Sequence, residues 1–240
     1  MTEELFRQDA YLKECDATVV ALTERGIILD RTVFYPTGGG QPGDSGELRL
    51  ADGRAIAIAD TLKGDGSGIV HVPAPNQTPL SENGPAVGDK VKAVLNWERR
   101  HRHMRMHTCM HLLCSIVSGD VTGGQIGDGK ARLDFNIPGD ALDKDRITAE
   151  LNRLVKEDHP AVPRWISDEE MAQRPDLVRT MSVKPPSGQG QVRLLDIDGI
   201  DLQPCGGTHV ARTGEIGQVE VAKIENKGKQ NRRINLRFVE

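Results

Sequence analysis

The stretch from residue 97 to residue 117, WERRHRHMRMHTCMHLLCSIV, decides how the chain divides. It contains no glycine or proline. Its apolar residues Met106, Met110, Leu113 and Val117 recur at steps of four, three and four residues. That period predicts an α-helix with one buried face, and the segments on either side follow different patterns.

The segment before this helix is typical of a β domain. Short apolar runs, among them ATVVAL (17–22), AIAIAD (55–60) and VKAVLNW (91–97), are separated by Gly, Pro and Asp. Strands at this close spacing predict a small barrel or sandwich. We therefore expect an N-terminal β domain over residues 1–95.

The segment after the helix mixes both periods. Ile147, Leu151, Leu154 and Val155 mark a second amphipathic helix, and VRLLDI (192–197), QVEVAKIE (218–225) and RRINLRFV (232–239) are predicted strands. This pattern indicates an α+β domain over residues 96–240.

Composition narrows the class of protein. The 31 Lys and Arg against 35 Asp and Glu give a net charge of −4, so binding of nucleic acid would depend on local basic patches. Four scattered cysteines do not form a disulfide scaffold, and the first residues lack the pattern of a secretion signal. We expect a soluble cytoplasmic protein that binds no membrane and needs no obligate protein partner.

The helix carries a candidate metal pair in HTCMH (107–111). Residues four apart lie on one helix face with Cβ atoms about 6 Å apart, so His107 and His111 can share one ion. His103 and His107 have the same spacing, and both pairs could be ordinary polar positions. Thr108 stands where zinc peptidases of the HExxH type carry a glutamate.

A second half-site lies in DLQPCGGTHV (201–210). Cys205 and His209 flank Gly206 and Gly207, which would let the backbone bend so that both ends face one point. A thiolate and an imidazole are typical zinc ligands, and the two half-sites together predict a zinc site. A structural ion would use all four ligands, whereas a catalytic ion usually leaves one position for water. The sequence leaves both open.

A glycine-rich loop follows a predicted strand in FYPTGGGQPGDSG (34–46). Its main-chain N–H groups could approach a ligand, although a simple β-turn is the better explanation of the glycines taken alone. No Lys-Ser/Thr pair follows, so the loop is not a phosphate-binding P-loop.

Four segments in order carry a family resemblance: FYPTGGGQPGDSG, HTCMHLL (107–113), GGQIGDGKARLDF (123–135) and CGGTHVARTGEIG (205–217). Together they resemble the editing domain of alanyl-tRNA synthetase and its freestanding relatives, the medium-size AlaX trans-editing proteins. The resemblance covers nearly the whole chain. It implies an α+β fold in which a small β-barrel of the translation-protein type packs on a zinc-bearing α+β domain.

The resemblance also implies an activity and a set of site residues. The activity is ATP-independent hydrolysis of mischarged seryl-tRNA(Ala), with glycyl-tRNA(Ala) as a second candidate. The implied ligands of one Zn2+ per chain are His107, His111, Cys205 and His209, and the implied substrate-binding residues are Thr37, Gly39, Gly40 and Gln41. On physical grounds, the N–H groups of Gly206 and Gly207, or the ion itself, could polarise the ester carbonyl, so these two glycines are further candidates for binding the substrate. An aminoacyl ester is already activated, so water on zinc could attack it without the helix glutamate. Asp134 is a candidate acceptor for a ligand histidine, with an exposed strand end as the alternative.

Contact with tRNA would need a local positive surface. Candidates are Arg99, Arg102 and Arg105, which precede the metal pair together with Arg100, and Lys227, Lys229 and Arg232 near the C-terminus. Each cluster could also be an ordinary solvated face.

Three other functions stay open. A zinc-stabilised tRNA-binding module without activity would close the ion with all four ligands. A metallopeptidase is disfavoured by Thr108. Threonyl-tRNA editing domains, which act on seryl-tRNA(Thr), carry similar histidine and cysteine pairs, and the glycine-rich loop favours the alanyl assignment.

Overall fold

The computed structural model describes residues 1–66, 68–77, 79–137, 142–179 and 190–239. The chain forms two compact units, residues 1–101 and 102–240. The predicted boundary near residue 95 falls at the end of strand β8 (Lys90–Leu95), whereas the two units divide after residue 101, inside the long helix.

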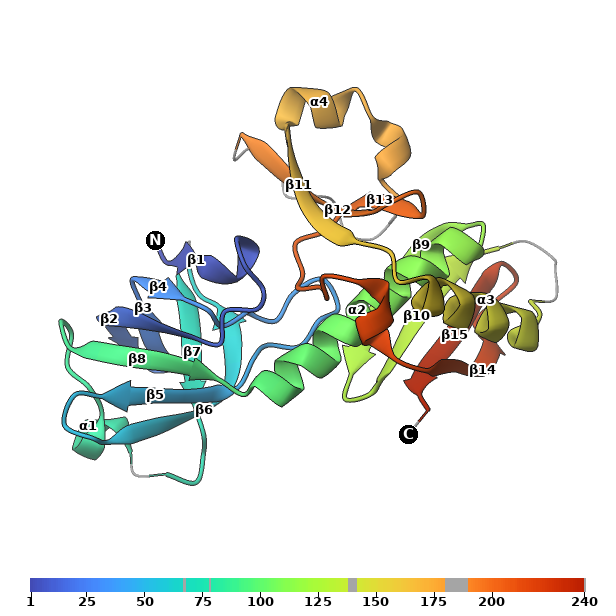
Figure 1. The fold of residues 1–240 in the computed structure, drawn as a ribbon. Coiled ribbons are helices and arrows are strands. Elements are labelled where there is room, and N and C mark those ends of the chain that lie inside the picture. Colours follow the sequence, from blue (N-terminus) through green and yellow to red (C-terminus); the bar gives the residue numbers. More distant parts are fainter. Residues whose placement is uncertain (67, 78, 138–141, 180–189, 240) are drawn as a thin grey trace. The chain divides into compact units, whose positions relative to one another are not determined.

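The first unit is a closed six-stranded β-barrel (Figure 1). Its strands follow the order β2-β3-β7-β6-β5-β8. Their bounds are Glu14–Thr23 (β2), Gly26–Leu29 (β3), Gly46–Leu50 (β5), Ala55–Lys63 (β6), Ile69–Pro73 (β7) and Lys90–Leu95 (β8). Two short strands, β1 (Glu3–Glu4) and β4 (Arg31–Thr32), pair in parallel, and helix α1 spans Leu80–Asn83.

The barrel closes around alternating apolar side chains. In β6, Ile56 and Ile58 are buried while Ala55 and Ala57 are exposed, as the two-residue period of a strand requires. The predicted β domain is confirmed as a barrel, because its six strands pair in a closed order. Ile56 and Ile58 share one buried cluster with Val19, Leu29, Leu48 and Val91 from four other strands.

A buried ion pair fixes the base of the glycine-rich loop within this unit. The Arg100 guanidinium is fully buried and donates from Nε to both carboxylate oxygens of Asp44, at 3.0 and 2.9 Å. The Asp44 carboxylate also accepts from the main-chain N–H of Tyr35, at 2.6 Å. The expectation that Arg100 belongs to an exposed basic run is therefore wrong, because its charge is compensated inside the unit.

The second unit contains a four-stranded antiparallel sheet in the order β14-β15-β10-β9. The strands are β9 (Asp120–Gly127), β10 (Lys130–Asn136), β14 (Val219–Asn226) and β15 (Asn231–Phe238). Helix α2 (Trp97–Ile116) begins in the first unit and continues in the second. The predicted helix is confirmed, but the expectation of a single buried face is wrong, because every side chain from Met106 to Cys114 is buried.

Helix α3 (Lys144–Glu157) packs against strand β14 of this sheet (Figure 1). Asp143 caps its first turn by accepting from the N–H groups of Asp145 and Arg146, both at 3.0 Å. The side chain of Asn152 exchanges two hydrogen bonds with the backbone of Val219. The four apolar residues that predicted the helix are all buried.

A three-stranded antiparallel sheet completes the second unit. Its strands, in order, are β11 (Ala161–Ser167), β12 (Gln191–Ile197) and β13 (Asp201–Pro204), and the short helix α4 (Asp168–Ala172) follows β11. One face packs Val192 and Leu194 on Leu177. Strand β13 leads directly into the segment that holds Cys205 and His209.

Candidate metal centre

Helix α2 presents two histidines on one face. His107 and His111 are each 7% exposed, and their ring centroids lie 5.5 Å apart. His103 is also buried but does not belong to the group of potential ligands, so the ambiguity between the two helical pairs is resolved in favour of His107 and His111.

The segment after β13 brings Cys205 and His209 to the same point. Cys205 Sγ lies 3.2 Å from His209 Nε2 and 3.5 Å from His107 Nε2. One ligand atom from each of the four residues lies within 4.8 Å of the others, which makes the group able to hold a metal ion. The two half-sites, about a hundred residues apart in sequence, are therefore one site.

The turn between these two ligands is held by Arg193 of β12. Its Nη1 donates to the carbonyl oxygens of Cys205 and Gly207, at 2.8 and 3.1 Å. Within the described ranges, neither Gly206 nor Gly207 is among the glycines with a positive φ. The turn is therefore made without the left-handed conformation that glycine favours, and a buried guanidinium secures it.

Asp201 orients His111, a contact that the sequence did not identify. Its Oδ2 accepts from His111 Nδ1 at 2.8 Å, which leaves Nε2 of the ring for a metal. Gln203 holds the carboxylate in turn, donating from Nε2 to both of its oxygens at 2.7 and 3.0 Å. Both residues lie on β13, in the four residues that precede Cys205.

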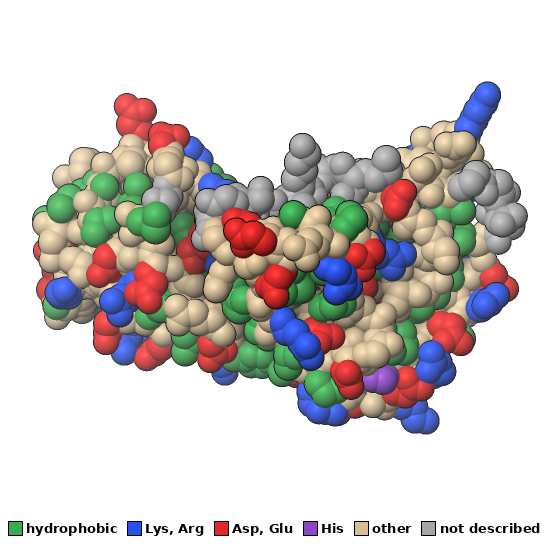
Figure 2. All heavy atoms as spheres, turned by 90° about the horizontal axis from the view of Figure 1, so that it is seen from above, with side chains coloured by type: hydrophobic (Ala, Val, Ile, Leu, Met, Phe, Trp, Pro, Cys, Tyr) green, Lys and Arg blue, Asp and Glu red, His purple; other side chains and the backbone are tan. Residues whose placement is uncertain are grey.

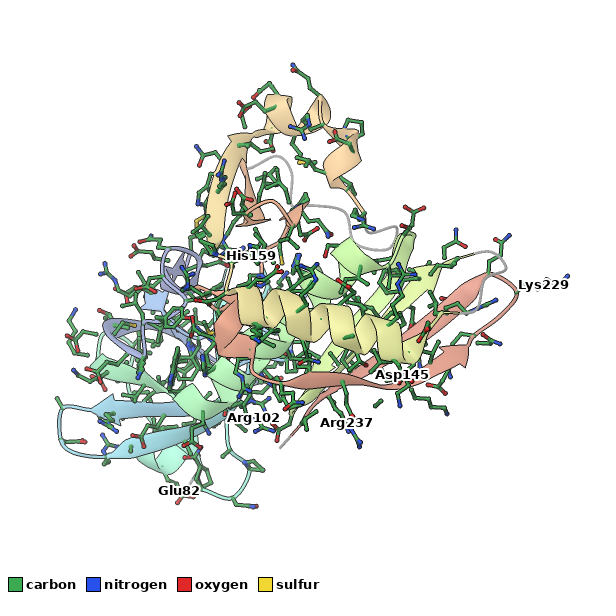
Figure 3. All side chains as sticks on the ribbon, turned by 45° about the vertical axis from the view of Figure 1, so that its right-hand side comes forward. Glu82, Arg102, Asp145, His159, Lys229 and Arg237 are labelled. Carbon is green, nitrogen blue, oxygen red and sulfur yellow. The ribbon has the colours of Figure 1, made fainter. Side chains whose placement is uncertain are left out.

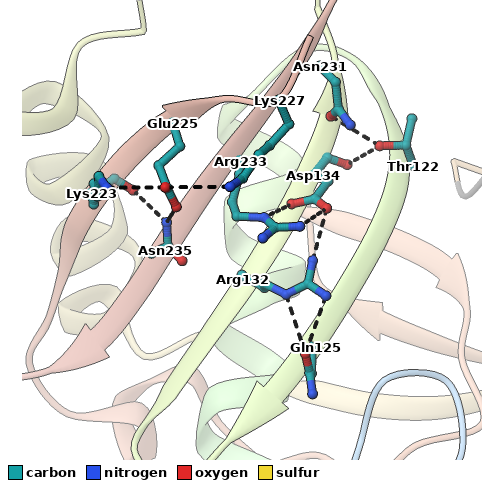
Figure 4. Close-up of polar contacts among 10 residues, drawn as sticks. All are labelled: Thr122, Gln125, Arg132, Asp134, Lys223, Glu225, Lys227, Asn231, Arg233 and Asn235. Carbon is teal, nitrogen blue, oxygen red and sulfur yellow. Dashed lines mark hydrogen bonds and ion pairs between the residues drawn. The ribbon is translucent and has the colours of Figure 1, made fainter.

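Asp134, the candidate for that role, has other partners (Figure 4). Its carboxylate accepts from Nε and Nη2 of Arg233 at 2.7 and 2.8 Å and from Nη1 of Arg132 at 2.9 Å. These hydrogen bonds lower the pKa of Asp134, against the opposing effect of its partial burial. The expectation that it supports a ligand histidine is wrong, because strand pairing places two arginines beside it.

Thr108, in the position of the absent glutamate, supports His209. Its buried hydroxyl donates to the carbonyl of Met104 at 3.0 Å and accepts from the N–H of Val210 at 3.2 Å. His209 Nδ1 lies 3.4 Å from the same oxygen and is its second donor. A hydroxyl has one proton and two lone pairs, so these three partners satisfy its whole hydrogen-bonding capacity. The contact with Nδ1 turns His209 Nε2 towards Cys205.

The electrostatics of the group suit metal binding. Burial would raise the pKa of the Cys205 thiol, but the rings of His107 and His209 hold it well below its ordinary value. Burial lowers the pKa of His209 despite the nearby thiolate. For His111, burial disfavours the charged ring, but the hydrogen bond to Asp201 and the neighbouring Cys205 raise its pKa to about 10. A thiolate and a neutral ring are the donor states that a metal needs, whereas the His111 ring, with its raised pKa, would have to give up a proton to bind an ion.

The glycine-rich loop of the first unit forms a tight turn. Gly38 and Gln41 exchange both main-chain hydrogen bonds, at 3.1 and 2.9 Å, and Gly39 and Gly40 between them have φ of 57° and 83°. Gln41 is buried and Thr37 is exposed. The Thr37 oxygen accepts from the N–H of Gly43 at 2.8 Å, so its proton stays available to a ligand.

The predicted basic residues have varied partners. Arg102 pairs with Asp128 at 2.7 Å and Lys227 with Glu225 at 3.6 Å, whereas Lys229 forms no ion pair within the described ranges. Arg99, Arg105 and Arg232 donate to the carbonyl oxygens of Gly43, Ile216 and Gly228. Burial, with the nearby charge of Arg102, lowers the pKa of Arg105.

Charges of both signs are interspersed on the face shown in Figure 2. Lys229 lies at the tip of the β14–β15 hairpin and points away from the sheet (Figure 3). The role of the six residues in binding tRNA stays a prediction. None of the helices that the structure describes has the length and apolar character of a membrane span.

Comparison with known proteins places these features in context. Residues 192–235 match the family described as the threonyl and alanyl tRNA synthetase second additional domain, and residues 6–99 match class II (A) tRNA synthetases. The alanyl-tRNA editing protein AlaX-M of Methanosarcina mazei is 38% identical, over 98% of this chain and 95% of the relative.

Two further relatives extend the comparison. The AlaX-M protein of Saccharolobus solfataricus is 35% identical over 98% of both chains. An alanine–tRNA ligase of Metallosphaera sedula is 34% identical over 93% of this chain but only 25% of its own length.

Proposed function

Because the chain belongs to the family of alanyl-tRNA editing proteins of the AlaX-M type, we propose that it is a trans-editing deacylase that hydrolyses the ester of mischarged seryl-tRNA(Ala). Glycyl-tRNA(Ala) is the second proposed substrate. The observation that carries the proposal is the convergence of His107, His111, Cys205 and His209 in one buried group. We expect the deacylation to take place there, on one Zn2+ per chain.

The spacing of the donor atoms supports zinc. With bonds of about 2.3 Å to sulfur and 2.0–2.1 Å to nitrogen, a tetrahedral ion separates a sulfur from a nitrogen by about 3.5 Å. The two distances from Cys205 Sγ are 3.5 and 3.2 Å. One thiolate with three imidazoles is also a donor set that zinc accepts.

The residues of the chain would hold and orient the reacting groups. Asp201 and Thr108 turn the ring nitrogens of His111 and His209 inward, and Arg193 fixes the turn that joins Cys205 to His209. When bound, zinc supplies Lewis acidity and lowers the pKa of a water molecule to about 7, so no helix glutamate is needed to activate water against an ester.

Recognition of the amino acid is assigned to main-chain and hydroxyl groups. We assign Gly206 and Gly207 to the ester carbonyl, where N–H donors stabilise developing negative charge. Thr37 is assigned to the serine hydroxyl, with Gly39, Gly40 and Gln41 shaping its loop. The available proton of the exposed Thr37 hydroxyl supports this role. Alanine, with no hydroxyl, would leave that group unpaired.

One assay tests the proposal. Purified protein is incubated with seryl-, glycyl- and alanyl-tRNA(Ala) and with seryl-tRNA(Thr), with and without a chelator. We expect free serine from seryl-tRNA(Ala), loss of activity on chelation and recovery with zinc. Cys205→Ala should lose zinc and activity, whereas the control Cys15→Ala, in the first unit, should keep both. Full activity of zinc-free Cys205→Ala would refute the metal-dependent mechanism.

The same assay tests two alternatives to the proposed function. Four protein ligands can close a tetrahedral ion, which favours a non-catalytic zinc-stabilised tRNA-binding module as the second candidate. That module would bind tRNA and release no amino acid. The family match also covers threonyl-tRNA synthetases, so hydrolysis confined to seryl-tRNA(Thr) would move the substrate to the threonyl side.

A further inference from the structure

Trp165 is the one strongly exposed aromatic side chain among the described residues. All eight aromatic residues of the chain lie in the described ranges, and Trp165 is 47% exposed on strand β11. The four phenylalanines and Tyr35 are buried, and Tyr11 and Trp97 are half-buried. Single exposed apolar side chains are common on proteins, so the position of Trp165 must decide whether it has a function.

Strand register places Trp165 two strands away from Cys205, in the same row of the sheet. Trp165 pairs directly with Arg193 of β12, and the N–H of Cys205 donates to the carbonyl of Arg193 at 3.0 Å. The three residues therefore form one row across the sheet. With strands about 4.8 Å apart, the Cα atoms of Trp165 and Cys205 lie about 10 Å apart.

The indole also shares a sheet face with the residues that support the centre. Side chains alternate along a strand, so Arg193, Gln203 and Asp201 project from the same face as Trp165. Asp201 contacts His111, and Arg193 holds the turn after Cys205. The opposite face carries the buried cluster of Val192 and Leu194, so Trp165 borders the centre instead of packing in that cluster.

The proposed substrate has a flat group at the matching distance. Its aminoacyl ester is attached to the ribose of the terminal adenosine, so the adenine ring lies within one nucleoside of the reacting carbonyl. An exposed indole offers a stacking surface to a base. The flanking side chains on this face of β11, Pro163 and Ser167, are uncharged.

We propose that Trp165 binds the terminal adenine of the aminoacyl-tRNA by stacking, an inference that rests on the proposed deacylase function. Loss of one base stack typically weakens binding about 5- to 150-fold. We expect Trp165→Ala to raise KM for seryl-tRNA(Ala) within this range while kcat stays close to that of the wild type. Trp165→Phe keeps an aromatic ring and should recover most of the affinity.

The matched control is Val162→Ala, which truncates an exposed side chain of the same strand on the opposite face. It should leave both constants unchanged. Zinc content and thermal melting of every variant show whether the fold is kept. If correctly folded Trp165→Ala has the KM of the wild type, the proposal is wrong.

A binding experiment separates this inference from the deacylase proposal. In a Trp97→Phe background, Trp165 is the sole tryptophan. Adenosine 5′-monophosphate should quench its fluorescence, whereas ribose 5-phosphate, which lacks the base, should not. Quenching without deacylation would overturn the proposed function and keep the adenine site. Deacylation without quenching, or equal quenching by both compounds, would overturn the adenine site.

Discussion

Replacing Thr108 with valine tests how the centre is built, because it removes one hydroxyl at nearly constant volume. The buried N–H of Val210 loses its acceptor, which costs about 1–3 kcal/mol of the free energy of unfolding. His209 loses the group that fixes its ring, and loss of such a support typically weakens metal binding 10- to 100-fold. The loss of stability should appear in the zinc-free protein, and the loss of metal affinity should appear when zinc binds.

Two measurements separate them. Denaturant unfolding of the zinc-free protein reports the loss at Val210, and competition with a chelator reports the loss of zinc affinity. Thr122→Val is the matched control, because its half-buried hydroxyl donates to the Asp134 carbonyl in the four-stranded sheet, away from the metal group. An unfolding free energy and a zinc affinity that both equal those of the wild type would refute the role of Thr108.

Three further predictions follow from other contacts. Burial lowers the pKa of His71 from 6.5 to about 4, so the folded state favours the neutral ring. About 3 kcal/mol of the free energy of unfolding is therefore lost as the pH falls from 6.5 to 4. His71→Gln should remove this pH dependence from acid-unfolding curves, and an unchanged curve would contradict the prediction. Arg100→Met leaves the Asp44 carboxylate buried without its cation, so the free energy of unfolding measured with denaturant should fall by about 3–5 kcal/mol. Adding Asp44→Asn should recover part of this stability. A fall of less than about 1 kcal/mol in Arg100→Met would disprove the role of the pair. Lys229→Ala with Arg232→Ala should weaken tRNA binding and reduce the slope of log affinity against log salt by about 2; an unaltered slope would exclude both as phosphate contacts.

The two long helices, most strands and the two histidine-bearing segments could be predicted because their signals are local. A step of four residues on a helix fixes where His107 and His111 point, whatever else surrounds them. The barrel likewise follows from two-residue alternation, as Ile56 and Ile58 show. Because the period and spacing of residues within a helix or strand are properties of the chain itself, the sequence was sufficient to predict these elements.

The supporting contacts could not be predicted, because they depend on which strands pair and in which register. Asp201 reaches His111 across 90 residues, and Asp134 faces Arg233 across 99. Both aspartates stand near the ends of short apolar runs, so sequence alone did not distinguish them. Arg100 similarly looked like part of a basic run until the position of Asp44 was known.

The ligands of the proposed ion come from two segments 98 residues apart, His107 on a helix and Cys205 beyond a distant strand. The unfolded chain does not hold these ligands together, so zinc would bind mainly the folded state and its binding free energy would add to the free energy of unfolding. Zinc limitation in the cell would then lower the folded population as well as the catalytic rate. Abundance of the protein would report on the zinc supply.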